Sequence, residues 1–174
     1  MKGTKKVISA LDVVHYLLSL DSERKYFTNK VMPSEEGWGI NPPVEGNFRL
    51  NKILHILQIL YYVKYDELLF SDNMLAYQYG AVVESVIKSF SNELVGLKSY
   101  PKANNVCPKQ KEFIKFISNH FKEYTNHELE DFSHDDPSWQ IARKERNKIM
   151  SLEADTLQYW KKFYQHVLEE IEEE

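Results

Sequence analysis

The hydrophobic positions of the chain recur at spacings of three and four residues, which predicts helices along most of its length. These patterns predict helices over residues 10–20, 50–65, 82–97 and 109–124, and a last helix whose apolar face runs over residues 157–171. Helix follows helix with short links. We therefore expect a mainly α, compact single-domain array that resembles a helical bundle, with at most one short β-hairpin.

Polar residues mark where several of these helices begin. Ser9 is suited to cap the first one, and Thr125 with Glu128 has the spacing of a capping box that opens another short helix. Pro137 suits the first turn of the helix after that, because a proline there gives up no hydrogen bond.

The predicted helix over residues 50–65 is apolar nearly all round. Only Lys52, His55 and Gln58 interrupt it, and their spacing of three places them in one narrow stripe. A helix of this kind belongs in the middle of a core, so we expect the stripe to reach water or a cleft.

The strongest break in the helical pattern lies between Pro33 and Asn47. This stretch, residues 33–47, holds three of the six glycines and three of the six prolines. It predicts a long loop that separates an N-terminal helical piece from the rest, with room for a short hairpin inside it. At 174 residues the chain is the size of one domain, so we expect residues 1–174 to form a single unit.

The charges are unevenly placed. The net charge is −4, from 22 basic and 26 acidic residues, and residues 169–174 hold five of the acids. The body is therefore close to neutral and carries an acidic tail, which excludes a globally basic or acidic protein that acts through its overall charge. The lone Cys107 excludes an intrachain disulfide, and no apolar run approaches the roughly 18 residues that span a bilayer, so we expect a cytoplasmic protein without membrane contact.

The chain shows none of the sequence motifs of the common catalytic classes. It has no glycine-rich phosphate loop, no GxSxG elbow, no HExxH and no paired cysteines, so we expect no cofactor, metal or catalytic residue. One alternative is a helical metal-dependent phosphohydrolase that uses His134 and Asp135, with His120 or His127 and Asp155. The competing interpretation is that His134 ends one helix and Asp136 caps the next.

A second alternative is a nucleic-acid-binding regulator. The basic residues of segment 143–148 would contact phosphates, although Glu145 lies among them. Domains that bind nucleic acid are usually more basic than this chain, so we favour a solvated helix face.

Three segments, taken in order, resemble a known family. Leu50-Asn51-Lys52-Ile53-Leu54-His55-Ile56 resembles its K-L-x-K-L-L-Y-F helix, and residues 76–83, AYQYGAVV, resemble its A-W-x-Y-G-P-V-V turn. Glu128-Leu129, Ser133-His134, Pro137 and Trp139 resemble its E-L-x-x-x-[ST]-H-x-x-x-P-W block. The family is the Panacea domain, also called the SocA-like antitoxin or phage-associated protein family.

The sequence departs from the family pattern at several positions. His55 replaces the usual tyrosine, Tyr77 the tryptophan and Ala81 the proline, and Ser138 is inserted between Pro137 and Trp139. We expect Gly80 to allow a sharp backbone turn, because a Cβ atom there would resist positive φ.

The resemblance implies a non-enzymatic protein-binding module of antitoxin type. Such a module neutralises a toxic protein partner, either by direct binding or by handing it to a protease. The candidate partner-binding or signature residues are Lys52, His55, Gln58, Tyr77, Tyr79, Gly80, Ser133, His134 and Trp139.

Overall fold

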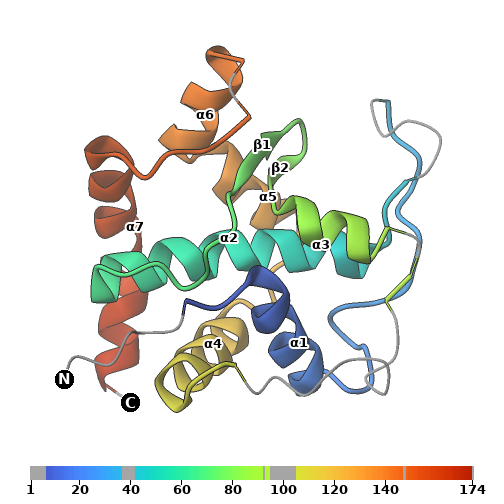
Figure 1. Cartoon of the computed structure of the whole chain (residues 1–174), viewed down its shortest axis with the longest axis horizontal. Coiled ribbons are helices and arrows are strands. Elements are labelled where there is room, and N and C mark those ends of the chain that lie inside the picture. The colour runs from blue at the N-terminus through green and yellow to red at the C-terminus, as the bar shows by residue number, and fades with distance from the viewer. Residues whose placement is uncertain (1–6, 37–41, 92, 95–104, 147, 174) are drawn as a thin grey trace.

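The computed structural model describes residues 7–36, 42–91, 93–94, 105–146 and 148–173. Its elements, in chain order, are α1 (Ala10–Leu20), α2 (Glu45–Tyr65), β1 (Leu75–Tyr77), β2 (Gly80–Val82), α3 (Glu84–Ser89), α4 (Pro108–His120), α5 (Asn126–His134), α6 (Pro137–Lys144) and α7 (Ala154–Glu173) (Figure 1). The mainly α fold with one short hairpin is confirmed.

Helix α2 lies at the centre of the molecule. Figure 1 shows it crossing the middle of the view, and α1, α3, α4, α5, α7 and strand β2 all contact it. Every residue from Gly46 to Tyr61 is buried, because neighbours cover the helix on all sides. The prediction that this apolar helix occupies the core is confirmed.

Helix α2 is one turn longer at its start than the sequence pattern predicted. It begins at Glu45 rather than at residue 50, and its first turn packs against the backbone that follows α1. A Cβ atom on Gly46 would lie 2.6 Å from the carbonyl oxygen of Thr28, so only glycine allows this close approach. The loop predicted over residues 33–47 therefore ends at Val44.

The long helix predicted over residues 82–97 is wrong over the part that the structure describes, and residues 92 and 95–97 lie outside that part. Residues 75–82 form an antiparallel hairpin in which Leu75 pairs with Val82 and Tyr77 with Gly80, and helix α3 has only six residues. The polar side chain of Asn51 accepts a hydrogen bond from the backbone of Val83 at 2.7 Å. This tertiary contact holds Val83 in an extended conformation, against the helical spacing of the apolar residues around it.

The hairpin considered within residues 33–47 lies partly outside the described residues. The described part contains an isolated antiparallel bridge between Val31 and Val44, where Met32 N donates to the oxygen of Pro43 at 2.9 Å.

The predicted helix starts are confirmed. Ser9 caps α1, Thr125 and Glu128 form a reciprocal capping box at α5, and Pro137 occupies the first turn of α6. The last helix covers the predicted span and buries Trp160 and Tyr164 against the core. Among the described residues, no helix is both long and apolar enough to cross a membrane.

Candidate functional site

The polar stripe of α2 lies inside the molecule. The exposed fractions of Lys52, His55 and Gln58 are 1%, 0% and 4%, so the expectation that the stripe reaches water is wrong. The alternative expectation, a cleft, is supported because Lys52 lines one pocket and His55 and Gln58 line another. Each of the three polar groups makes at least one contact elsewhere in the fold, which offsets part of the cost of its burial.

His55 joins α2 to the junction between α5 and α6. Its Nε2 atom lies 2.7 Å from Oδ2 of Asp136, and its Nδ1 atom lies 3.5 Å from the hydroxyl of Ser133. The other oxygen of Asp136 accepts hydrogen bonds from the backbone and hydroxyl of Ser138, both at 2.8 Å, and so caps α6. One carboxylate therefore both starts a helix and binds the central helix.

The serine, histidine and carboxylate occur in the same combination in serine hydrolases. Here Ser133, His55 and Asp136 are all fully buried, with exposed fractions of 0%. A substrate cannot contact the Ser133 hydroxyl in this arrangement. The contacts hold helices together rather than present a nucleophile.

Lys52 lies between α2 and the hairpin. Its ammonium group donates to the carbonyl oxygen of Ala81 at 3.2 Å and lies 4.3 Å from the centre of the Phe48 ring. No carboxylate lies within ion-pairing distance of it among the described residues. Burial lowers the pKa of Lys52 from 10.5 to about 7, a shift that the more distant charge of Glu130 only partly opposes.

Gln58 contacts the segment that follows α2 rather than the hairpin. Its amide binds the segment after α2, donating to the oxygen of Phe70 at 2.9 Å and accepting from the backbone nitrogens of Leu69 and Phe70. It therefore fixes the chain where it leaves α2.

The hairpin backbone is held by side chains of α5 and α6. Trp139 Nε1 donates to the oxygen of Tyr77 at 2.9 Å, and His134 Nε2 lies 3.2 Å from the oxygen of Gln78. The rings of His134 and Trp139 lie 4.5 Å apart, and Arg143 reaches the oxygen of Ala76. The backbone of β1 and its turn is thus bound by side chains from two helices.

Gly80 occupies the point where the hairpin approaches α2 and α5 most closely. Its φ is +100°, and a Cβ atom would lie 2.9 Å from Cε of Lys52 and 3.0 Å from Cβ of Ser133. The expected positive φ at Gly80 is confirmed, although the residue turns a hairpin rather than leading directly into a helix. Seven of the nine candidates belong to this hairpin or lie directly against it. Among the residues that the structure describes, His55 is connected to it only through Ser133, and Gln58 lies apart from it.

The sequence patterns missed several side chains that build this region. Asn47 donates to the oxygens of Ile87 and Phe90, while Asn51 binds Asn47 and the backbone of Val83. Together with His55 these two asparagines lie at spacings of four on α2. The sequence signal that could have revealed these two residues is the helical spacing of their amides in an otherwise apolar segment.

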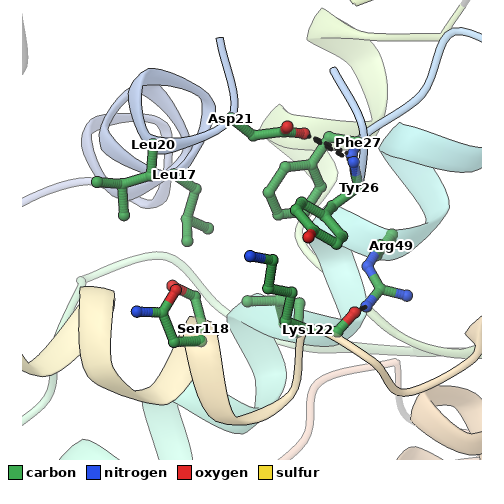
Figure 2. Close-up of a pocket in the computed structure, with 10 residues that line it drawn as sticks. Leu17, Leu20, Asp21, Tyr26, Phe27, Arg49, Ser118 and Lys122 are labelled. Atoms are coloured by element: carbon green, nitrogen blue, oxygen red, sulfur yellow. Dashed lines mark hydrogen bonds between the residues drawn. The ribbon is translucent and has the colours of Figure 1, made fainter. Parts of the chain in front are cut away.

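Arg49, which also belongs to α2, binds the segment between α4 and α5. Its guanidinium donates to the carbonyl oxygens of Phe121, Lys122 and Tyr124, in the segment that follows α4. Figure 2 shows it beside a small pocket, with Asp21 directed at the backbone nitrogens of Tyr26 and Phe27. This pocket has a volume of about 60 Å³ and is too small for most ligands, so we interpret these contacts as structural.

The pocket beside the hairpin is larger, with a volume of about 340 Å³. Its walls are mostly apolar and include Phe48, Tyr77, Tyr79, Val82 and Ile87, with Lys52 as the charged residue among them. Pockets of this size at the boundary between elements are typical of small-ligand sites.

The residues considered for a metal site do not converge. His134 ends α5 and lies 3.6 Å from Glu130, whereas Asp135 is exposed at the helix end. His127 lies on the surface of the same helix, 3.9 Å from Asp131, and His120 packs on Phe121. No three His, Cys, Asp or Glu residues in the described ranges are placed to hold a metal ion. The competing interpretation, in which His134 ends one helix and Asp136 caps the next, is confirmed.

The comparison with protein families decides what kind of domain this is. The model described as antitoxin SocA-like, Panacea domain matches residues 50–140, which is more than half of the chain. The chain belongs to this family. No curated protein and no solved structure matches it. The matched part of the Panacea domain runs from α2 into α6 and contains all nine candidate residues.

Proposed function

We propose that this Panacea domain is a non-enzymatic antitoxin that binds a toxic protein partner and neutralises it. The observation that carries the proposal is the family match over residues 50–140, which spans the hairpin and the helices that hold it. The chemistry of the region agrees with a binding role, because its buried polar groups are engaged in contacts that hold the elements of the fold together.

We place the partner-binding face at the hairpin turn and the adjoining ends of α5 and α6. Gln78 is exposed there, and Tyr77, Tyr79, His134 and Trp139 are half-buried beside it. Aromatic residues that are partly exposed on a firmly held support are typical of protein interfaces, since little conformational entropy is lost when they bind. The face is held rigidly by the hydrogen bonds from Trp139 and His134 to the hairpin backbone.

The partner would be a toxic protein encoded beside this chain. The test is to induce the adjacent gene in a bacterial host with and without this protein, and to measure growth and co-purification. Growth arrest that this protein relieves, with a complex recovered from the cells, supports the proposal. A toxic neighbour that is neither bound nor relieved would overturn it.

The face itself is tested with a matched pair of substitutions. Gln78→Arg adds bulk and charge to the exposed turn, whereas Gln158→Arg makes the same change at an exposed position of α7. We expect the first variant to lose at least tenfold in partner affinity and the second to bind normally. Equal binding by both variants would remove the turn from the interface.

Neutralisation would proceed by sequestration or by delivery to a protease. Toxin levels in hosts with and without their ATP-dependent proteases separate the two routes. Sequestration leaves the toxin level unchanged, while delivery lowers it only where the protease is present.

A further inference from the structure

The buried ammonium group of Lys52, beside the hairpin pocket, has fewer partners than a buried charge normally has. Lys52 is 1% exposed, yet only one of its three potential hydrogen bonds is made to an oxygen, that of Ala81, among the described residues. An ammonium group in an apolar interior normally has an anionic partner, because burial without one is strongly unfavourable. The described residues place no carboxylate within 4 Å of it.

The volume next to this lysine could hold such a partner. The pocket measures about 340 Å³ and is lined by Phe48, Val82 and Ile87 in addition to the lysine and the two tyrosines Tyr77 and Tyr79. The polar residues Asn47, Asn51, Gln78 and Ser91 also line it. The amides of Asn47 and Asn51 are already bound to the backbone of α3 and of the residues on either side of it. Among the described residues, Lys52 is the one charged residue that lines this pocket, and most of the remaining wall is apolar.

We propose that this pocket binds a small monocarboxylate with an apolar body, its carboxylate paired with Lys52 and its body against Phe48, Val82 and Ile87. The volume suits a medium-length chain or a single ring with a short acid, at the small end of the range for ligand sites. The pocket shares Tyr77, Gln78 and Tyr79 with the proposed partner-binding face. Its ligand is therefore tested on the chain alone, where the outcome does not depend on a protein partner.

Binding of an acid would change the protonation of the lysine. The pKa of Lys52 is lowered to about 7 by burial, and a paired carboxylate would raise it again. Above neutral pH the complex would therefore take up a proton from solution as it forms. This proton uptake distinguishes pairing with Lys52 from simple partition of an apolar chain into the protein.

The test uses octanoate as the probe and methyl octanoate as its uncharged counterpart, titrated into the full chain by calorimetry at pH 8. We expect saturable 1:1 binding of octanoate, with proton uptake revealed by two buffers of different ionisation enthalpy. Lys52→Met should weaken octanoate binding at least tenfold and leave the ester unaffected. The same change at the exposed Lys115 should alter neither ligand.

A second approach leaves the lysine in place. Ile87→Trp, at a half-buried wall residue, should fill the pocket and abolish binding of both ligands. In the unmodified protein, the ¹⁵Nζ resonance of Lys52 should titrate at higher pH once octanoate is bound. Absence of saturable binding would overturn the proposal. Octanoate binding that Ile87→Trp leaves unchanged and that does not shift the Nζ titration would also overturn it, even if Lys52→Met failed to fold.

Discussion

His55 and Asp136 lie 81 residues apart in the sequence, yet Nε2 of the histidine and Oδ2 of the aspartate are 2.7 Å apart in a fully buried pair. The same carboxylate binds Ser138 and so begins α6. One contact thus sets the position of α6 relative to α2, and through α6 the position of the side chains that hold the hairpin.

Removing this carboxylate should be the most damaging polar substitution in the core. Asp136→Ala leaves His55 without its partner and α6 without its cap, so we expect a loss of about 3–5 kcal/mol in the free energy of unfolding. Urea denaturation followed by circular dichroism measures it. Asp131→Ala, at an exposed position of α5, should change the value by less than about 0.5 kcal/mol. A loss below about 1 kcal/mol for Asp136→Ala would contradict the structural role given to the pair.

Gly80 should tolerate no side chain. Gly80→Ala places a Cβ atom 3.0 Å from Cβ of Ser133 at a φ of +100°, so we expect a loss of about 1–3 kcal/mol. The matched control is Gln78→Ala on the same turn, where the side chain is exposed and the backbone oxygen that binds His134 is kept. The midpoints of thermal unfolding of the two variants test this expectation. Similar midpoints for the two would show that the hairpin relaxes around the added atom.

The indole hydrogen bond of Trp139 should stabilise the hairpin locally. Trp139→Phe keeps an aromatic ring but removes the donor to the oxygen of Tyr77, a loss of about 1 kcal/mol. We expect hydrogen exchange of the β1–β2 amides to accelerate by roughly fivefold, which is that free energy expressed as an opening equilibrium. Amides of α4 in the same sample serve as the internal control. Uniform acceleration across the protein would indicate global destabilisation instead.

The buried lysine should make stability depend on pH. The folded chain releases the Lys52 proton near pH 7, while the unfolded chain holds it until about pH 10.5. Between these values the unfolded state binds more protons, so the free energy of unfolding rises with pH, by at most about 1.4 kcal/mol per pH unit for this one group. Below pH 7 both states are protonated and the contribution is constant.

Comparison with Lys52→Met isolates this contribution from that of other groups. The stability of the unmodified protein relative to this variant should increase from pH 7 to pH 9 in urea titrations. A difference that stays flat over the range would show that Lys52 keeps its ordinary pKa in the folded state.

Arg49 should not be replaceable by lysine. Its guanidinium reaches three backbone oxygens at the end of α4 and the side-chain oxygen of Asn126, a geometry that one ammonium group cannot reproduce. We expect Arg49→Lys to lose about 2 kcal/mol in denaturation experiments. Arg146→Lys, at an exposed position, provides the matched comparison and should remain near the original value. Equal effects of both changes would mean that charge alone suffices at position 49.

Local sequence signals predicted most of the helices well. Capping residues such as Thr125 and Asp136 act within a few residues of the backbone that they bind, so their effect can be inferred from spacing. The central position of α2 followed from its apolar surface. The hairpin could not be predicted in this way, because the hydrogen bond from Val83 to Asn51 joins residues 32 positions apart.

The sequence indicated which segments belong to the family but not how they contact one another. The three segments all lie within the family match, and the structure brings parts of each of them together at the hairpin. The burial of Lys52 and His55 was not foreseen, because a polar stripe on an apolar helix gives no sign of which distant group will cover it. Ala81 and Asp136 are those groups, and nothing in their local sequence indicates it.

The polar side chains of α2 share one further property. Asn47, Arg49, Lys52 and Gln58 all bind main-chain atoms of other segments. Main-chain atoms are the same whatever side chain a residue carries. The segments held in this way can therefore exchange many of their outward-facing residues without losing their attachment to α2, which would let the same scaffold present different surfaces to different proteins.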